Sequence, residues 1–260
     1  MRRSQLHPTA YRVFFLLCVS LIVFPKGGFR VGGLPVTWGY LLFFASVVFL
    51  MPYRMFVVRA VWVRRQLVAL GIIVPFTLIF FYTLVGYGAP TSFQRNGVVS
   101  TGTGLIFLPI LFLWFYPPLL PLLDREQVLK CFRYCVLVAA IFGIFLFFWR
   151  PYTGINIHIP FLTTNGADAG DPSLTSNNAR GFFFKLISTY NNGNIYGVAT
   201  LILLRLFDVA TPRRWERWVI RFALFLTLSR TIWAGLIFNE VLSLIAAVLA
   251  QAQSLSLIHI

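Results

Sequence analysis

Apolar residues form long runs along the whole chain. Eight apolar segments follow one another, at 11–25, 35–52, 67–88, 104–123, 134–149, 194–208, 218–229 and 231–250. A helix needs roughly 20 apolar residues to cross the hydrocarbon core of a bilayer. The pattern therefore predicts an all-α polytopic integral membrane protein with about eight transmembrane segments, of which the first and the seventh are short.

Breaks are expected in two places along these segments. The fourth segment is predicted to be bent or partly broken by its prolines, which are Pro109, Pro117, Pro118 and Pro121. The seventh and eighth segments form one apolar stretch that only Ser229-Arg230 interrupts. This pair raises the question of why a cation stands inside apolar sequence.

Composition and charge agree with a membrane protein. Of the 260 residues, 58% are hydrophobic and 11% are charged, the mean hydropathy is +0.80, and the formal net charge is +15. The basic residues stand mainly in short gaps between apolar runs. Membrane topology therefore explains them better than nucleic-acid binding, for which the chain has no basic soluble domain.

The distribution of basic residues predicts the orientation. With the N-terminus inside, the inner side holds 15 of the 22 Lys and Arg residues and the outer side holds 7. Cytoplasmic loops are enriched in Lys and Arg, so we expect a cytoplasmic N-terminus. The long connection 150–193 is then extracytoplasmic, and the break at Ser229-Arg230 faces the same side.

Arg230 is the first candidate for chemistry. An arginine costs roughly 2.5–3.5 kcal/mol to insert at the bilayer centre. It either anchors a helix end at the interface by snorkelling, or faces a polar cavity where its forked donors hold two phosphate oxygens. We favour the cavity, because the residue stands at a helix break and shares a face with the polar loop.

The stretch STYNNGNIYGVATLILL at 188–204 predicts a helix that begins at the outer face. Its asparagines either cap this helix or, with the free N–H groups of its first turn, bind phosphate. Asn194 is the candidate for contact with sugar hydroxyls or with the anion. Upstream, Arg180 and Lys185 are either solvated loop charges or, for Arg180, a second phosphate clamp.

Other polar residues point to structural roles. His158 is a surface histidine rather than a catalytic base in our interpretation. Asp168 and Asp171 lack a third ligand, and the three cysteines lack metal-ligand spacing, so neither a metal nor a cofactor is predicted. Glu240 is expected to pair with an inner arginine. The loop TTNGADAGDPSLTSNNARG at 163–181 is expected to be irregular and external.

Two motifs give the chain a family resemblance. TYNNGNIYG resembles the stretch in which an Asn, followed by an aliphatic residue, an aromatic residue and Gly, opens an outer-face helix in the O-antigen ligase and O-antigen polymerase superfamily. LTLSRTIWAGL resembles the Thr-x-Ser-Arg signature that begins the shared membrane domain of that superfamily. The resemblance covers roughly residues 180–250.

The resemblance implies a multi-pass protein of the bacterial inner membrane that acts as a metal-independent glycosyltransferase in lipopolysaccharide or exopolysaccharide synthesis. Its donor would be a glycan on undecaprenyl diphosphate, bound in contact with membrane lipid. Its acceptor would be a hydroxyl on a second lipid-linked glycan or on lipid A–core. Arg230 would be the signature arginine and Arg180 the upstream one, although Arg180 lies farther before Asn194 than in the family. Ser229, Asn194, Lys185 and Tyr190 would contact substrate, and other envelope polysaccharide assembly proteins would be partners.

The resemblance also sets the expected domain limits. Residues 1–179 are expected to form an N-terminal membrane region with the start of the outer loop, and 180–254 the start of the ligase-like domain. LSLIHI at 255–260 matches one reading frame of a sequencing adapter and is expected to be an artefact rather than a genuine tail. The family's catalytic histidine belongs to a later outer loop, so this portion alone is expected to be inactive.

Two other functions stay open. A transporter or flippase of lipid-linked oligosaccharides predicts paired repeats and charges spread through many helices, neither of which the sequence displays. A non-enzymatic membrane assembly subunit predicts that substitutions of Arg230 are tolerated.

Overall fold

The computed structural model describes residues 8–31, 34–55, 108–116, 123–154, 157–164, 178–180, 183–211 and 213–258, with isolated positions between 67 and 82. Helices dominate these residues, in agreement with the sequence, and two small two-stranded sheets accompany them. The chain forms two compact units. The described residues before Phe132 make up the first, except Ile22–Lys26, which belongs with the second.

The first unit is built around a helix pair. Its elements are α1 (Pro8–Cys18), which passes into a π-helical turn (Val19–Val23), β1 (Gly28–Val31), β2 (Leu34–Thr37), α2 (Trp38–Met55) and α5 (Leu108–Phe115). Its core is made by the buried side chains Leu17, Phe43, Leu50, Phe115 and Tyr116. Half of the fourth predicted segment, with Pro117, Pro118 and Pro121, and all but isolated positions of the third lie outside the described residues.

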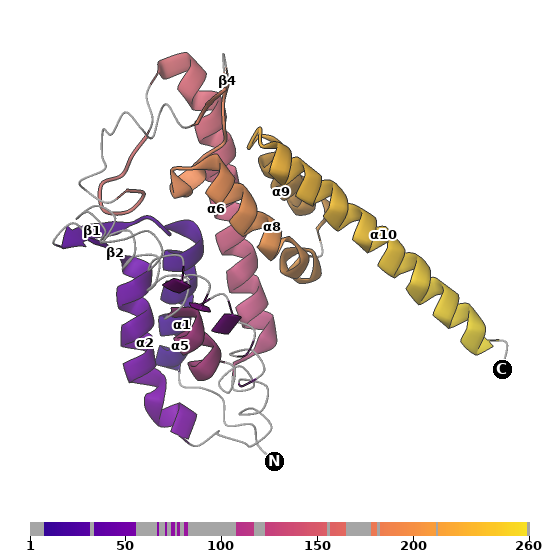
Figure 1. Cartoon of the computed structure of the whole chain (residues 1–260), viewed down its shortest axis with the longest axis horizontal. Helices are drawn as coiled ribbons and strands as arrows, with labels where there is room; N and C mark the ends of the chain where they lie inside the picture. The colour runs from indigo at the N-terminus through magenta and orange to yellow at the C-terminus, as the bar shows by residue number, and fades with distance from the viewer. Residues whose placement is uncertain are drawn as a thin grey trace. The chain divides into compact units, whose positions relative to one another are not determined.

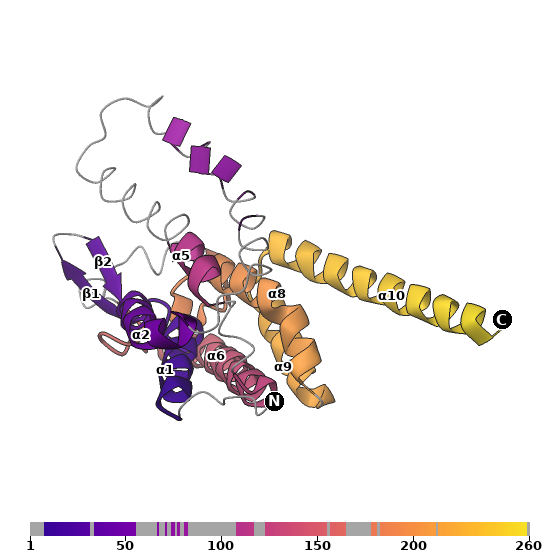
Figure 2. The ribbon, with the colours of Figure 1, turned by 90° about the horizontal axis from the view of Figure 1, so that it is seen from below.

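A β-hairpin joins the first two apolar segments, which the all-α prediction did not foresee. Strands β1 and β2 pair antiparallel from Gly28↔Thr37 to Val31↔Leu34 (Figure 2). Gly28 has a φ of +152°, and a Cβ at this position would lie 2.1 Å from the carbonyl oxygen of Val36. Glycine is therefore required where the two backbones approach.

The second unit carries the motifs singled out in the sequence (Figure 1). Its elements are α6 (Arg125–Thr153, in this unit from Phe132), β3 (Ala179–Arg180), β4 (Phe183–Phe184), the 3₁₀ turn η5 (Ser188–Tyr190), α8 (Gly193–Ala210), α9 (Arg214–Phe225) and α10 (Arg230–Ile258). Its core is formed by buried residues that include Val136, Ala140, Leu186, Leu204, Phe207, Ile220, Leu224 and Ile232.

Three described helices are long and apolar enough to cross a membrane, namely α6, α8 and the Arg230–Leu249 part of α10. Most of α10 beyond its first turns is uncovered, with Ile237, Phe238 and Leu244 each about two-thirds exposed (Figures 1 and 2). Apolar surface of this extent is typical of contact with lipid or with another helix, which supports membrane association.

The seventh predicted span differs from expectation. The helix in this region is α9, which has 12 residues and begins at Arg214, before the predicted segment 218–229. At 1.5 Å per residue it is about 18 Å long, too short for the bilayer core. It is amphipathic, with Ile220, Ala223 and Leu224 buried and Trp218 and Phe225 exposed.

The end of the long connection 150–193 is buried, whereas most of the loop 163–181, expected to be irregular and external, lies outside the described residues. Every residue of 185–191 has less than a tenth of its surface exposed. The Leu186 amide donates to the Leu226 carbonyl at 3.0 Å, and the Ser188 hydroxyl donates to the Ala139 carbonyl at 2.6 Å. A Cβ on Gly143 of α6 would lie 2.6 Å from the Leu186 side chain, so this glycine gives the segment its place against α6.

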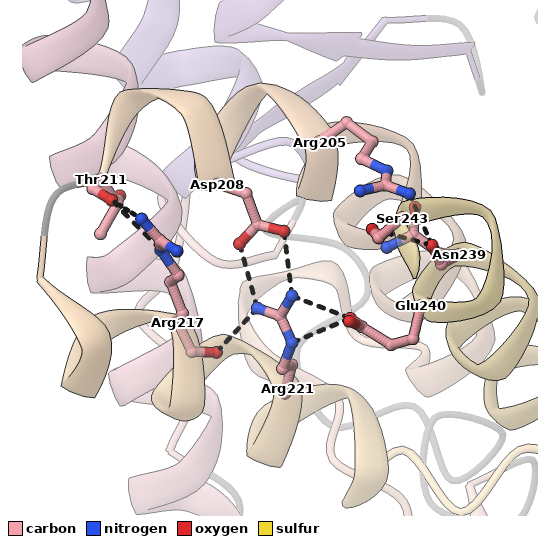
Figure 3. Close-up of polar contacts among 8 residues, drawn as sticks. All are labelled: Arg205, Asp208, Thr211, Arg217, Arg221, Asn239, Glu240 and Ser243. Atoms are coloured by element: carbon pink, nitrogen blue, oxygen red, sulfur yellow. Dashed lines mark hydrogen bonds and ion pairs between the residues drawn. The ribbon is translucent and has the colours of Figure 1, made fainter. Parts of the chain in front are cut away.

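Ion pairs join the helices of the second unit. Arg133 of α6 and Glu216 of α9 form a buried pair, with Nη2–Oε1 at 2.9 Å and Nε–Oε2 at 2.7 Å. Arg221 of α9 donates to both carboxylate oxygens of Asp208 on α8 and to Glu240 on α10 (Figure 3). The expected pairing of Glu240 with an arginine is confirmed. The hydrogen bonds to Asp208 and Glu240 raise the pKa of Arg221.

Candidate functional site

The predicted break before Arg230 is present as a tight turn between α9 and α10. α9 ends at Phe225 and α10 begins at Arg230. Between them Leu228 has a φ of +48°, in the left-handed region that costs energy for a branched side chain. The Thr227 hydroxyl donates to the Leu224 carbonyl at 2.7 Å and closes the end of α9.

Trp233 ties the start of α10 back to α9. Its indole N–H donates to the Phe225 carbonyl at 2.9 Å, and its ring stacks on the Phe225 ring with centroids 5.2 Å apart. The carbonyl belongs to the last residue of α9, where backbone acceptors lack partners within the helix. Trp233 therefore holds Ser229 and Arg230 at a defined position, and nothing in the sequence identified this role.

The start of α8 is capped by asparagines. Asn192 accepts from the amides of Asn194 at 2.9 Å and Ile195 at 3.2 Å, and Asn178 accepts from the amide of Gly193 at 3.1 Å. These are three of the four amides that a helix N-terminus leaves without partners. The prediction that free N–H groups of this turn bind phosphate is therefore wrong, and the capping alternative is confirmed.

Lys185 and Asn194 meet beside this cap. The Lys185 ammonium donates to the Asn194 side-chain oxygen at 2.9 Å, and Lys185 as a residue is only 4% exposed. A Cβ on Gly193 would lie 2.7 Å from the Lys185 Cβ, so glycine lets the lysine stem pass close to the helix start. The ammonium is thereby placed next to the first turn of α8.

One open pocket is lined by residues of the buried segment, the start of α8 and the turn into α10. It has a volume of about 640 Å³ and is lined by Lys185, Asn194, Leu228, Ser229, Arg230, Thr231 and Trp233. Four of the six predicted site residues, Lys185, Asn194, Ser229 and Arg230, therefore lie around one space. Arg230 is exposed and has no hydrogen bond or ion pair with any residue that the structure describes.

The other two predicted site residues have different surroundings. Tyr190 lies in the core, where its hydroxyl donates to the Ile22 carbonyl at 3.1 Å and burial raises its pKa to about 12. It is absent from the pocket lining, and its predicted substrate contact stays a prediction. Arg180 lies in β3 opposite Phe183, and its side chain is outside the described residues.

His158 is half-buried, not a freely solvated loop residue. Burial, and then repulsion from Arg150, lower the pKa of its imidazole. Arg150 is itself buried and lies over the ring of Phe184, with its guanidinium carbon 3.6 Å from the ring centroid. Asp168 and Asp171 lie outside the described residues.

The pocket's chemistry is that of anion and hydroxyl recognition. Lys185 and Arg230 supply positive charge, while Ser229, Thr231 and Asn194 supply neutral donors and acceptors. Within the described part of the chain, no cluster of His, Cys, Asp and Glu could hold a metal ion. The seven lining residues include neither a carboxylate nor an imidazole.

Comparison with known proteins does not place the chain in a family. No protein-family model matches the chain, and no curated protein or solved structure does either. The family resemblance rests on the two sequence motifs.

Proposed function

We propose that this chain carries the donor site of a membrane glycosyltransferase that moves a glycan from undecaprenyl diphosphate to an acceptor hydroxyl, as an O-antigen or exopolysaccharide polymerase or ligase. The observation that supports this proposal is the pocket at the start of α10. Two segments about 35 residues apart in sequence bring Lys185 and Asn194 together with Ser229 and Arg230 there. Asn194, Ser229 and Arg230 belong to the two motifs that carry the resemblance, and Lys185 shortly precedes the first of them.

The pocket's cations suit a diphosphate leaving group. In the transfer, the acceptor oxygen bonds to the anomeric carbon as the bond from that carbon to the diphosphate oxygen breaks. The electron pair goes to the diphosphate, and the acceptor's proton goes to a general base outside the pocket lining. Arg230 can offer two parallel N–H donors and Lys185 a point charge to the growing negative charge.

Substitution of Arg230 tests the proposal. Arg230→Lys keeps the positive charge but loses the two-pronged donor geometry, so we expect loss of glycan transfer with expression unchanged. The protein as encoded by its source gene would be placed in nanodiscs with a lipid-linked glycan and an acceptor, and product would be measured. Arg213→Lys is the matched control, because Arg213 has an exposed side chain outside the pocket.

The same preparation separates the alternatives. Binding of undecaprenyl diphosphate, followed by native mass spectrometry, should weaken in Arg230→Lys and stay unchanged in Arg213→Lys. Unchanged transfer in Arg230→Lys would return Arg230 to an anchoring role. Absence of transfer by the unsubstituted protein would favour the assembly subunit. Movement of the lipid-linked glycan across the bilayer without a new glycosidic bond would identify a transporter instead.

A further inference from the structure

A second concave surface lies between α9 and α10, apart from the pocket at Arg230. It is a groove of about 660 Å³, in the size range of small-molecule sites. Its lining includes Arg214, Arg217, Trp218, Phe222, Phe225 and Leu236. Phe225 stacks on Trp233 of the other pocket, so the two cavities share a wall.

The groove changes in character along α9. Arg214 and Arg217 stand in its first turns, Trp218 and Phe222 follow on the same helical face, and Phe225 closes the helix. Trp218 is 71% exposed and Phe222 is 44% exposed, so their rings form an uncovered apolar surface. One end of the groove is thus basic and the other aromatic.

The positive charge at the basic end is only partly neutralised. Arg221 and the carboxylate Glu240 also line the groove, and Arg221 donates to Glu240 and to Asp208, so these charges offset one another (Figure 3). Arg217 donates from Nε and Nη2 to the Thr211 carbonyl, at 3.2 and 2.8 Å. Arg214 is exposed and has no ion pair or hydrogen bond with a described residue.

We propose that this groove binds one anionic phospholipid, with the phosphate between Arg214 and Arg217 and an acyl chain along Trp218, Phe222 and Phe225 toward Leu236. A phosphodiester presents two oxygens to the guanidinium groups, and the acyl chain covers the exposed rings. Basic pockets beside membrane-spanning helices recognise anionic lipid headgroups in this way. The helix α10, which lines the groove with α9, is of membrane-spanning length, so lipid would be within reach of the groove.

The test measures lipid preference by native mass spectrometry on the detergent-purified chain. Phosphatidylglycerol and phosphatidylcholine with identical acyl chains would be titrated separately. Wild type should bind phosphatidylglycerol more tightly. Arg214→Gln should weaken that binding about fivefold, which corresponds to the loss of one basic residue at a lipid surface, and leave phosphatidylcholine binding unchanged.

Two variants and one competitor make the test decisive. Arg213→Gln removes the same charge from a residue that does not line the groove, and should change binding less than twofold. Phe222→Ala should weaken the binding of both lipids equally, because it removes part of the surface that contacts the acyl chain. Phe222 is not a core residue, so this substitution should leave the fold intact.

Three outcomes would overturn the proposal. Equal affinity of the wild-type protein for the two lipids would exclude a site that recognises the anionic headgroup. An effect of Arg213→Gln as large as that of Arg214→Gln would indicate general surface charge. Displacement of phosphatidylglycerol by millimolar inorganic phosphate would indicate a site for free phosphate rather than lipid.

Discussion

The two cationic side chains of the pocket at the start of α10, Lys185 and Arg230, are held in place by different contacts. Lys185 is buried, with its ammonium held by Asn194, whereas Arg230 stands exposed at the first residue of a helix. Charge at a buried position is costly unless polar groups surround it. The hydrogen bond to Asn194 therefore places the lysine, while Trp233 places the arginine by fixing the turn before it. Substrate contact at these residues remains a prediction.

His158 gives a pH-dependent test at the residue scale. Its folded-state pKa is lowered, so the unfolded chain binds the proton more readily. Neutral His158 therefore costs the folded state nothing above the ordinary histidine pKa of about 6.5. Below that pH the unfolded chain takes up the proton first, and the free energy of unfolding falls. We expect the melting temperature to fall between pH 7.5 and 5, and to fall less in His158→Gln. Equal falls in the two proteins would contradict this assignment.

The cap of α8 decides how that element begins. Asn192 and Asn178 satisfy the first three amides, and the Asn191 side-chain amide donates to the Thr163 carbonyl at 2.8 Å. The loop before the helix is thereby fixed by its own asparagines. Lys185 reaches Asn194 only because this cap holds the first turn of α8 beside the buried segment.

Removal of the cap tests its contribution. Asn192→Ala leaves two amides without acceptors and should lower the free energy of unfolding by about 1 kcal/mol. Asn192→Ser keeps a capping oxygen and should restore most of the loss. Tryptophan fluorescence during thermal unfolding would measure both variants. A serine variant no more stable than the alanine variant would mean that the side chain is not acting as a cap.

Within the second unit, α6 and α9 are joined by the buried pair of Arg133 and Glu216. The Glu216 side chain is 1% exposed and that of Arg133 is 10% exposed. Arg133 Nη2 donates one hydrogen bond to Glu216 Oε1, and Nε lies 2.7 Å from Oε2. The two charges, which each would be costly to bury alone, therefore offset one another. The pair fixes α9 against α6 at one end, while packing of Leu224 and Leu226 fixes it at the other.

Breaking this pair should have a large effect. Glu216→Gln leaves the arginine charge buried without its carboxylate, so we expect a loss of about 3–5 kcal/mol in unfolding free energy. Glu126→Gln, which breaks the exposed pair of Glu126 with Lys130, should cost less than about 1 kcal/mol. Unfolding in increasing SDS would compare the two. Combining Arg133→Met with Glu216→Leu should recover much of the loss, since no unpaired charge remains.

The apolar pattern by itself determined the helical character of the chain, the apolar helices α6, α8 and α10, and the break at Ser229-Arg230. Local sequence is sufficient for these features, because helix length and interruption follow from the run of apolar residues. The apolar pattern also predicted that Lys185, Asn194, Ser229 and Arg230 lie on the same side of the membrane, since the segments that contain them join the same ends of neighbouring helices.

Only the tertiary structure decided which polar groups were already occupied. Asn192 and Asn178 accept from the amides of α8, Tyr190 turns into the core, and Glu216 at the start of α9 pairs with Arg133. The partners of these groups lie up to 168 residues away in sequence. Hydrogen bonds and ion pairs depend on distances of about 3 Å, which periodicity along a chain does not contain.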